Sequence, residues 1–273
     1  MKLENKVALV TGGGSGLGQA IALAFVREGA KVAVNDIDEA RIESTLQEMK
    51  RLQGEGFGVK ADVTSSQEVK EMFAKVVERF GTLDILVNNA GILEVSAKAK
   101  ENVAKLLQLM ATTGRAEMSL EATRYMSDDE WHRMVSIHLH GTFYCTREAL
   151  NIMEDKGYGK IINIASICGM SGACTGSPHY SAAKGGIIGF TKSVATEVIG
   201  KGVYVNAIAP GYLDTPGLMA DMTPEILTTV TMRTPLGRLG TPAEVVPIAV
   251  FLASDESSFV VGQVVSPNGG MVI

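Results

Sequence analysis

A glycine-rich turn near the start of the chain most constrains the fold. It lies between Lys6–Val10, a β-branched run that predicts a buried strand, and Gln19–Glu28, whose apolar residues have helical spacing. The turn reads TGGGSGLG and contains Gly12, Gly16 and Gly18. Glycines let the backbone turn tightly and approach a ligand closely, and a helix N-terminus favours an anion. A strand, a glycine turn and a helix in this order predict a phosphate site at the start of an α/β sheet.

Segments with strand and helix patterns alternate along the rest of the chain. Further strands are predicted at Lys31–Asn35, Gly58–Lys60, Ile85–Val87, Lys160–Ala165, Val203–Ala209 and Gln263–Ser266. Helices are predicted at Glu39–Gln53, Ser66–Phe80, from Asp128 to Glu148 or beyond, from Ser177 or Tyr180 to Gly200, and at Pro242–Ala253. This alternation predicts the α/β class, with a doubly wound parallel sheet of Rossmann type, helices on both faces, and a single domain over residues 1–273.

Two segments depart from the alternation. In residues 94–125, apolar residues recur at helical spacing from Val95 to Met110, and Gly114 is predicted to end that helix. This segment is interpreted as a lid, an interface element or a solvated excursion, with a place near the rim of the active site favoured. Residues 212–240 are rich in Met, Thr and Pro, which suits a mobile lid over an apolar substrate or a surface helical hairpin.

Composition excludes several classes of protein. The chain has 273 residues, of which 46% are apolar and 20% charged, so it can bury a large core. The net charge is -5 and no basic block occurs, which argues against a nucleic-acid partner. No apolar run reaches membrane-spanning length, and the N-terminus lacks a signal-peptide pattern. Cys145, Cys168 and Cys174 have no metal spacing, so we expect a reduced cytoplasmic protein without a metal site, with Cys168 and Cys174 as small fillers.

Polar residues follow several of the predicted strands, where ligands of parallel sheets bind. These residues are Thr11, Asp36, Asp62, Asn88 and Ser166. Asp36 is placed to accept the hydroxyls of an adenosine ribose and to repel a ribose phosphate, which predicts NAD rather than NADP. Alternatively, Asp36 caps the next helix. Asp62 is predicted to contact the adenine or to cap the helix that starts near Ser65.

Ser166, Tyr180 and Lys184 form the second predicted cluster. Tyr180 and Lys184 are four residues apart, so they share one face of a helix. A Lys ammonium beside a Tyr favours the phenolate and lowers its pKa, so the Tyr can exchange a proton with an alcohol oxygen. The Ser166 hydroxyl can hold the same oxygen. The alternative is that Tyr180 only packs while Lys184 is solvated.

Taken in order, these motifs make the chain resemble the short-chain dehydrogenase/reductase family over essentially its full length. The matching pieces are TGGGSGLG, the NNAG run at Asn88–Gly91, Ser166, YSAAK at Tyr180–Lys184, PGYLDT at Pro210–Thr215 and the closing GQVVSPNGG. The resemblance implies one Rossmann-type domain, a nicotinamide cofactor and, usually, a homotetramer. It also implies that Tyr180 is the general acid/base, that Lys184 lowers its pKa and holds the nicotinamide ribose, and that Ser166 binds the substrate oxygen.

The same resemblance assigns the cofactor contacts. It implies that Gly12, Gly16, Leu17 and Gly18 line the pyrophosphate, and that Asp36 holds the adenosine ribose. Asp62 and Val63 would contact the adenine, Asn89 the ribose side of the pocket, and Leu213 and Thr215 the nicotinamide carboxamide. The remaining predicted cofactor residues belong to the same motifs and are Ser15, Ala90, Gly91, Tyr180, Lys184, Pro210 and Gly211.

The chain departs from the family pattern in two places. The family has an Asn in the pattern W-x6-N-L-x-G, and here the segment from Trp131 to Gly141 has His138 at that position. The family's Asn helps to position a water in a proton relay to the Lys. An imidazole has a donor and an acceptor, so our hypothesis is that His138 keeps the relay role, although its bulk could alter the relay instead. The segment 94–125 is also longer than the family's usual connection.

The sequence therefore predicts an NAD-dependent oxidoreductase that interconverts a secondary alcohol and a ketone. The Met-rich segment favours a mainly apolar small molecule, either alicyclic, aromatic or steroid-like. A 3-oxoacyl thioester is the alternative substrate. A non-catalytic dinucleotide-binding or scaffold protein is the alternative of another class. A nucleotide-sugar-modifying enzyme is disfavoured because the C-terminal region is too short for a separate substrate domain.

Overall fold

A seven-stranded parallel sheet forms the centre of the protein in a computed structural model, which describes residues 1–115, 118–172, 174, 176–220 and 222–273. The strands are β1 (Val7–Thr11), β2 (Lys31–Asp36), β3 (Gly56–Lys60), β4 (Ile85–Asn88), β5 (Gly159–Ile164), β6 (Val203–Ile208) and β7 (Val264–Val265). Their order across the sheet is β3-β2-β1-β4-β5-β6-β7, and every neighbouring pair is parallel. The predicted α/β class and the parallel sheet are confirmed.

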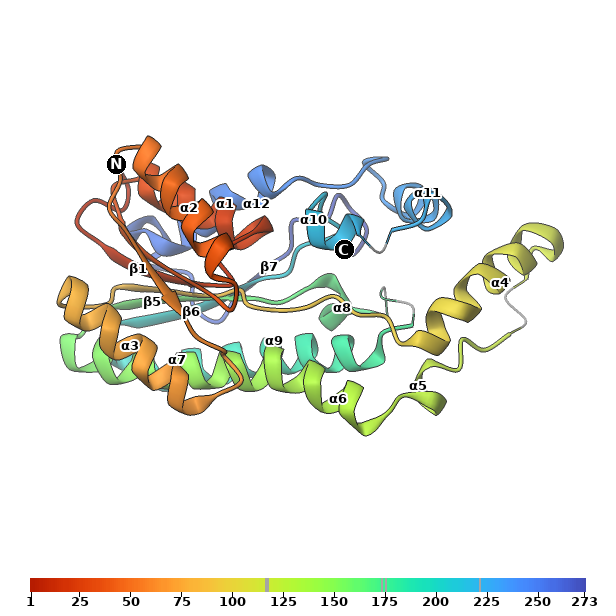
Figure 1. Ribbon diagram of the computed structural model, residues 1–273, viewed down its shortest axis with the longest axis horizontal. Coiled ribbons are helices and arrows are strands. Elements are labelled where there is room, and N and C mark those ends of the chain that lie inside the picture. Colours follow the sequence, from red (N-terminus) through yellow and green to blue (C-terminus); the bar gives the residue numbers. More distant parts are fainter. Residues whose placement is uncertain (116–117, 173, 175, 221) are drawn as a thin grey trace.

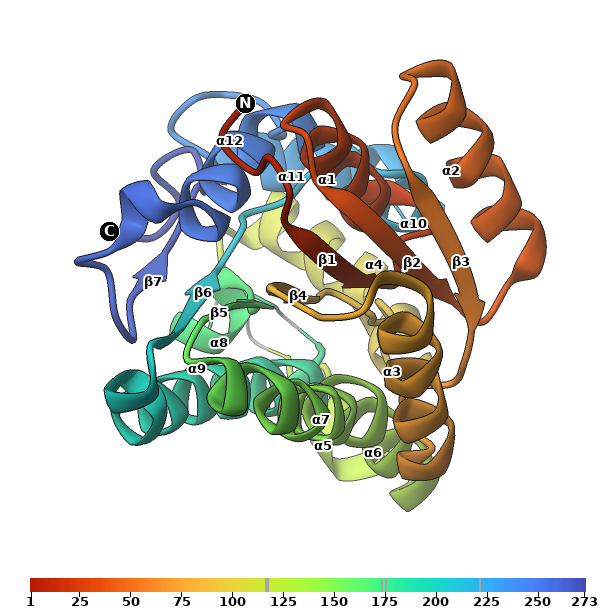
Figure 2. The same ribbon diagram turned by 90° about the vertical axis from the view of Figure 1, so that its left-hand side faces the viewer.

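Helices cover both faces of the sheet, as Figures 1 and 2 show. One layer consists of α1 (Gly16–Arg27), α2 (Glu39–Arg51) and α12 (Pro242–Ala253). The other consists of α3 (Ser66–Phe80), α7 (Gly141–Lys156) and α9 (Pro178–Val198). Because both faces are covered, β1 and β5 are buried along their whole length, which explains why their sequences do not alternate strictly between apolar and polar residues.

Local signals explain where several helices begin and end. The Ser65 hydroxyl accepts the Glu68 N–H at the start of α3, and Gly81 ends that helix in the left-handed conformation. The predicted helix from Asp128 begins as expected, with Ser127 and Glu130 forming a capping box. These caps satisfy N–H groups that the first helical turn leaves unpaired.

The predicted helix Asp128–Glu148 is interrupted. The structure has α6 (Asp128–Val135), then the π-helical turn η1 (Ser136–His140), then α7, which continues to Lys156. A π turn adds one residue to a helical turn and is frequent at functional sites. Here the Thr142 hydroxyl donates to the His138 carbonyl at 2.7 Å, inside this part of the helix.

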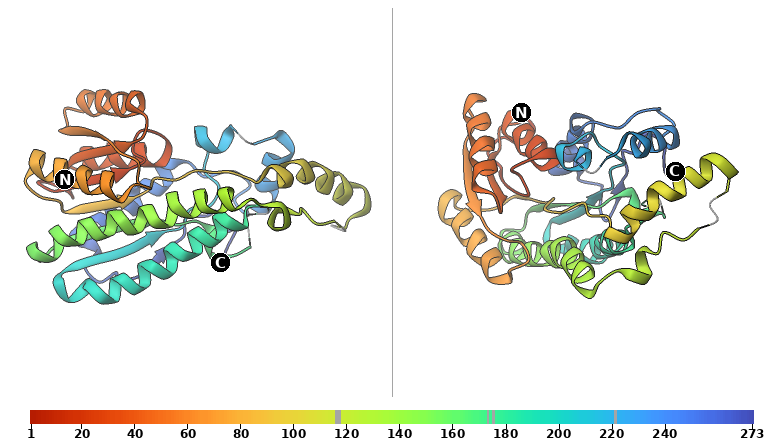
Figure 3. Two further views of the ribbon diagram at one scale, coloured as in Figure 1. Left: turned by 60° about the horizontal axis from the view of Figure 1, so that its bottom comes forward. Right: turned by 45° about the vertical axis from the view of Figure 1, so that its right-hand side comes forward.

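The order of the strands reverses between β1 and β4, and this switch point opens a crevice at the carboxyl ends of the strands. Further helices lie beyond this edge of the sheet, as Figures 1 and 3 show. They are α4 (Ala97–Thr113), α5 (Ala122–Tyr125), α8 (Ile167–Met170), α10 (Pro216–Met219) and α11 (Pro224–Arg233). The remaining short elements are η2 (Ile199–Lys201) and η3 (Asp255–Ser257).

The helix expected in residues 94–125 is present as α4, and Gly114 follows it with a left-handed φ of +70°. Its apolar pattern is only partly tested, because the side chains of Leu107 and Met110 lie outside the described residues. In Figure 3, α4 extends away from the sheet and its helices. Within the described chain, no helix combines the length and apolar character needed to cross a membrane.

Candidate active site

One cavity of about 790 Å³ runs along the carboxyl ends of the strands. It is lined at one end by the glycine turn and the end of β2, and at the other by residues around Ser166. The cavity brings together most of the residues predicted from the sequence, namely Gly12, Ser15, Gly16, Leu17, Asp36, Asp62, Val63, Asn89, Ala90, Gly91, His138, Ser166, Tyr180, Lys184, Pro210, Gly211, Leu213 and Thr215. The two predicted clusters therefore belong to a single site.

The glycine turn is held in shape by Asn89, which follows β4. The Asn89 side chain donates to the carbonyls of Thr11 at 3.0 Å and Gly12 at 3.1 Å. Gly18 does not line the cavity, although it was predicted to bind the cofactor. Instead, a Cβ on Gly18 would lie 2.3 Å from both the Asn89 amide nitrogen and the Gly12 oxygen, so glycine lets α1 approach the turn. Asn88, next to Asn89, donates to Thr146 and Asn163 in the core.

The Asp36 carboxylate is fixed beside the glycine turn. Its two oxygens accept the main-chain N–H groups of Gly14 and Asp38, each at 3.2 Å, and the residue is only 8% exposed. The alternative that Asp36 caps the next helix is wrong, because Asp38 is the N-cap of α2 and accepts the N–H groups of Ala40 and Arg41. Asp36 is therefore an oriented acceptor at one end of the cavity.

Asp62 and Val63 line the cavity next to Asp36. The Asp62 carboxylate accepts the Thr64 N–H at 2.8 Å, whereas Ser65 caps α3, so Asp62 is not the helix cap. Arg41 of α2 also lines this end of the cavity and was not predicted. It lies five residues after Asp36 on the exposed start of a helix, where the sequence alone gives no signal of its orientation.

Ser166, Tyr180 and Lys184 meet at the other end. Ser166 is the N-cap of α8, and its hydroxyl accepts the Cys168 N–H at 3.1 Å. The Lys184 ammonium donates to the Ile164 carbonyl at 2.6 Å and lies 5.7 Å from the centroid of the Tyr180 ring. Lys184 is 4% exposed, so the alternative of a solvated lysine is wrong.

The pKa of Tyr180 differs from the expectation. Burial raises the pKa of Tyr180 to about 12, although the hydrogen bond with Ser166 acts in the opposite direction. Burial also lowers the pKa of Lys184 to about 7. The expected effect of Lys184 on Tyr180 is weak here because the same low-dielectric surroundings disfavour the charged form of both groups. In the protein alone, Tyr180 is a protonated donor and Lys184 is close to its midpoint at neutral pH.

His138 packs directly against Tyr180 in the candidate catalytic cluster. It is 2% exposed, and its ring meets the Tyr180 ring edge-on with 5.2 Å between centroids. Its Nε2 lies 2.9 Å from the Ile92 carbonyl oxygen and 3.2 Å from the Ile92 nitrogen. Its Nδ1 is buried and finds no hydrogen-bond partner among the described residues. Burial, followed by the nearby Lys184 charge, lowers the pKa of His138 well below its usual value, so the imidazole is neutral at pH 7.

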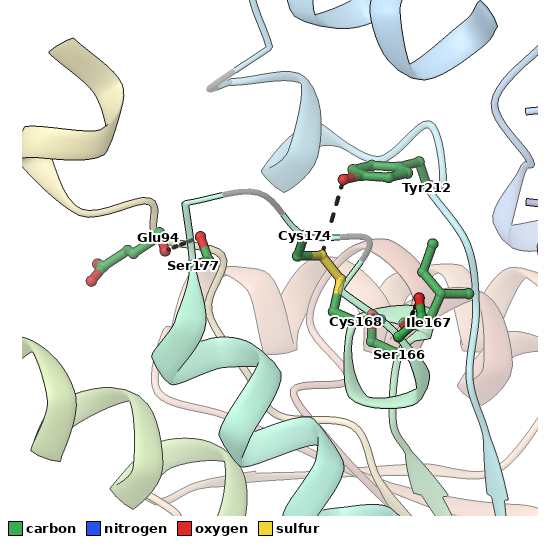
Figure 4. The surroundings of a disulfide bond; sticks show 8 residues. Glu94, Ser166, Ile167, Cys168, Cys174, Ser177 and Tyr212 are labelled. Atoms are coloured by element: carbon green, nitrogen blue, oxygen red, sulfur yellow. Dashed lines mark hydrogen bonds between the residues drawn. A yellow bond between two sulfur atoms is a disulfide. The ribbon is translucent and has the colours of Figure 1, made fainter. Parts of the chain in front are cut away.

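The interpretation of Cys168 and Cys174 as separate small fillers is wrong, because the structure joins them in a disulfide (Figure 4). Both residues line the cavity beside Ser166. Their Cα atoms are 5.2 Å apart, within the range that a disulfide spans. A spacing of six residues permits this approach only when the loop between them folds back, which the sequence does not reveal. Cys145, by contrast, is a buried free thiol.

The cavity also has a wall that sequence reasoning missed. Tyr212 lies inside the PGYLDT motif and faces the disulfide, with its hydroxyl 4.0 Å from the Cys174 sulfur. The sequence could have indicated Tyr212, because it lies between Gly211 and Leu213, which were both predicted to bind the cofactor. Ile167, Ile92, Leu93 and Leu218 add apolar lining. They flank predicted motif residues but carry no chemistry that would single them out.

The segment 94–125 meets the site at its base. The Glu94 carbonyl accepts the Ser177 hydroxyl at 3.3 Å (Figure 4), and its carboxylate pairs with Arg133 at 2.9 Å. A Cβ on Gly176 would lie 3.1 Å from the Cβ of Ala99, which is in the first turn of α4. The inserted segment therefore packs on the loop that leads into the Tyr180 helix.

The fold and this geometry match those of one family. The family profile described as short chain dehydrogenase matches residues 6–225. The chain belongs to the short-chain dehydrogenase/reductase family. This short-chain dehydrogenase/reductase is 37% identical over 274 residues to 3-oxoacyl-(acyl-carrier-protein) reductase FabG of Thermotoga maritima, covering 100% of both chains. It is 35% identical to (2S)-((R)-hydroxy(phenyl)methyl)succinyl-CoA dehydrogenase subunit BbsD of Thauera aromatica, covering 99% of this chain and 98% of the relative.

Solved structures of other family members superpose over nearly the whole chain. A putative gluconate dehydrogenase from Agrobacterium tumefaciens has a TM-score of 0.87 at 35% identity, covering 100% of this chain and 98% of that chain. Levodione reductase has a TM-score of 0.85 at 31% identity, covering 98% of both. The family assignment makes this protein an oxidoreductase that uses a nicotinamide dinucleotide.

The residues present fit that cofactor. The turn has left-handed glycines at Gly12 and Gly16, with φ of +59° and +55°, which turn the chain sharply before α1. A fixed carboxylate stands at one end of the cavity and a buried lysine at the other. Among the described residues, no group of three or more metal-ligating side chains could hold an ion.

Proposed function

We propose that this protein is an NAD(H)-dependent oxidoreductase that interconverts 3-hydroxyacyl and 3-oxoacyl thioesters. The observation that carries the oxidoreductase chemistry is the single cavity that joins Asp36 to Ser166, Tyr180 and Lys184. The names of the two relatives, one acting on an acyl-carrier-protein thioester and one on a CoA thioester, support the thioester.

The proposed roles follow from the contacts of the catalytic side chains. The nicotinamide ring, when bound, supplies or takes up a hydride at the carbinol carbon. Tyr180 gives its proton to the oxygen during reduction and accepts it during oxidation. Ser166 holds the same oxygen, because its hydroxyl oxygen accepts the Cys168 N–H and its hydrogen can turn from Tyr180 to the substrate oxygen. Protonated Lys184 favours the phenolate during the transfer.

Lys184 and His138 provide a route for the proton beyond Tyr180. The Lys184 ammonium uses one of its three donors on Ile164, which leaves two for the cofactor ribose and a water. With Nε2–H donating to Ile92, His138 keeps an Nδ1 lone pair that can accept from such a water. In this proposal His138 positions the relay and does not itself touch the substrate.

The geometry of Asp36 favours NAD over NADP. Its carboxylate is held by two main-chain N–H groups, so it cannot swing aside to make room for a ribose phosphate. A ribose with two free hydroxyls instead donates to the carboxylate in charge-assisted hydrogen bonds. Arg41, a cation that lines the same end of the cavity, forms an ion pair with Asp38 at 3.3 Å.

The test of the proposed substrate is a comparison of steady-state kinetics. NADH oxidation by acetoacetyl-CoA, and NAD reduction by 3-hydroxybutyryl-CoA, should be fast relative to the same assays with acetoacetate and 3-hydroxybutyrate. Equal rates with the free acids would contradict a role for the thioester. Absence of turnover with any alcohol or ketone, despite tight NADH binding, would favour the non-catalytic alternative.

A second candidate substrate is an apolar alicyclic or aromatic alcohol or ketone. It is favoured by the apolar residues packed around the disulfide, of which Ile167 and Tyr212 line the cavity, and by the likeness to levodione reductase. A panel of cyclic diketones, measured beside the thioesters, distinguishes the two. Residues 212–240 would act as the substrate lid in either case, because Leu213, Thr215 and Leu218 line the cavity.

The assembly and the location of the protein complete the proposal. We propose a cytoplasmic homotetramer, in line with the family resemblance. Phe143 on α7 is 42% exposed, which gives one apolar contact for a helix-to-helix interface. Light scattering of the purified protein tests the tetramer directly, and a monomer would contradict it.

A further inference from the structure

The Cys168–Cys174 disulfide lies inside the active-site wall. Cys168 is 5% exposed and follows Ser166 by two residues, while Cys174 is half-buried. In Figure 4 the disulfide lies between the Ser166 turn and the Tyr212 side chain. The same apolar cluster contains Tyr180. A cysteine pair at this place therefore contacts Ser166 and Tyr212, which both line the cavity.

The disulfide links two parts of the site that are otherwise held separately. On one side, the Cys168 N–H donates to the Ser166 hydroxyl at 3.1 Å. On the other, Cys174 precedes Gly176 and Ser177, which contact Ala99 and Glu94 at the base of the inserted segment. The disulfide thus joins Cys168, whose N–H is bonded in the Ser166 turn, to Cys174, which is close in sequence to the residues that contact the inserted segment.

We propose that Cys168 and Cys174 form a thiol–disulfide exchange site that sets the affinity for the substrate: the disulfide holds the wall closed, and its reduction by a small thiol such as glutathione releases it. Tyr180 lies in α9 and Ser166 follows β5 by two residues, and neither β5 nor α9 contains a residue of the disulfide. Reduction should therefore change substrate binding while the catalytic groups stay in place.

Reduction of the disulfide by a small thiol takes two steps. A thiolate attacks the more exposed Cys174 sulfur and expels Cys168 as a thiolate, which takes up a proton. A second thiolate attacks the mixed disulfide and releases Cys174, which also becomes a thiol. Two small thiols are oxidised to one disulfide, and the two protein sulfurs are reduced. Disulfides of proteins in reducing compartments are usually transient and redox-sensing or catalytic, which suits this pair.

The expected size of the effect comes from the entropy of closing the loop. The disulfide joins residues six apart, and the chain-entropy relation gives a factor of about 50 at 25 °C for so short a loop. This factor is an upper limit for the rise in KM of the substrate on reduction. The Kd of NADH should not change, because Asp36 and the glycine turn lie at the other end of the cavity.

The experiment compares wild-type protein equilibrated in glutathione buffers of graded oxidised-to-reduced ratio. Alkylation of free thiols and mass spectrometry give the fraction of disulfide, and KM for acetoacetyl-CoA and Kd for NADH are measured on the same samples. Cys174→Ser should behave as reduced protein in every buffer. Cys145→Ser is the matched control and should respond like wild type, because Cys145 is buried and burial raises the pKa of its thiol to about 12.

The kinetic measurement rests on the proposed function, so hydrogen exchange provides a second readout. Amides of residues 168–172 and 176–180 should exchange faster in the reduced protein and in Cys174→Ser, whatever the substrate is. The proposal is supported if KM follows the disulfide fraction in wild type and not in Cys174→Ser, with exchange taking the place of KM if acetoacetyl-CoA is not turned over. It is overturned if the disulfide never forms in these buffers, if KM stays constant while the disulfide fraction changes, or if exchange stays constant where KM is not measurable. Failure of acetoacetyl-CoA as a substrate alone would count against the proposed function only.

Discussion

Asp36→Asn tests the assignment of the cofactor with almost no change of shape. The substitution keeps the size of the side chain and removes its charge. Because both Asp36 oxygens accept main-chain N–H groups, an amide at this position can satisfy only one of them. We therefore expect weaker NAD binding and a loss of discrimination against NADP.

The magnitude follows from two effects. Weakening a hydrogen bond from the ribose to a charged acceptor costs NAD about 1.5–3 kcal/mol. A ribose phosphate with a charge of about -2 at roughly 4 Å from the carboxylate is repelled by about 2 kcal/mol even at the dielectric constant of water. Together these effects reduce the ratio of kcat/KM for NAD to that for NADP by about 300-fold or more.

The assay measures kcat/KM for both cofactors at saturating substrate, in wild type, Asp36→Asn and the control Asp38→Asn. Asp38 is two residues away but caps α2 and does not line the cavity, and Asn is also a good cap. The control should keep the wild-type ratio. A wild-type enzyme that prefers NADP, or an Asp36→Asn variant with the wild-type ratio, would refute the reasoning.

Four further predictions concern the catalytic cluster and its support. Tyr180→Phe should lower kcat by at least about 10²-fold with unchanged Kd for NADH, and retained turnover would exclude Tyr180 as the proton donor. Because the Lys184 pKa of about 7 is below its unfolded value of about 10.4, the unfolded chain binds more protons between these values. The free energy of unfolding should thus rise with pH in this window by up to about 1.4 kcal/mol per pH unit, and urea titrations should find this slope reduced in Lys184→Met. Gly18→Ala should destabilise the protein and weaken NADH binding because its Cβ would clash with Asn89, whereas Gly189→Ala, with open space around it on α9, should be neutral or stabilising. His138→Asn should fold normally, since an amide can pair with both main-chain groups of Ile92, and should change the pH–rate profile; an unchanged profile and turnover would exclude a special role for the imidazole.

Much of the fold could be predicted because local signals agreed with the tertiary structure. Ser66–Phe80 and Pro242–Ala253 match α3 and α12 over their whole length, since a capping residue precedes each and the apolar spacing is regular. The π turn at Ser136–His140 could not be predicted in this way. It accompanies a contact between His138 and Ile92, which are 46 residues apart, and no helical periodicity encodes such a contact.

Site residues could be predicted where a chemically suitable residue type follows a strand or shares a helix face with another. Properties that depend on tertiary packing could not. Asp36, Ser166 and Lys184 were found because their residue types follow a strand or share a helix face. The raised pKa of Tyr180 depends on burial by distant segments, and the Cys168–Cys174 disulfide on how one loop folds back. Neither property follows from spacing along the chain.

The central claim is that one cavity joins an NAD site to a ketone-reducing Ser166–Tyr180–Lys184 cluster that acts on a 3-oxoacyl thioester. The most direct measurement is the rate of NADH oxidation by acetoacetyl-CoA, beside NADPH and beside Tyr180→Phe. The account predicts rapid oxidation of NADH, much slower oxidation of NADPH, and loss of the reaction in Tyr180→Phe. A preference for NADPH, or a Tyr180→Phe variant as active as wild type, would contradict it.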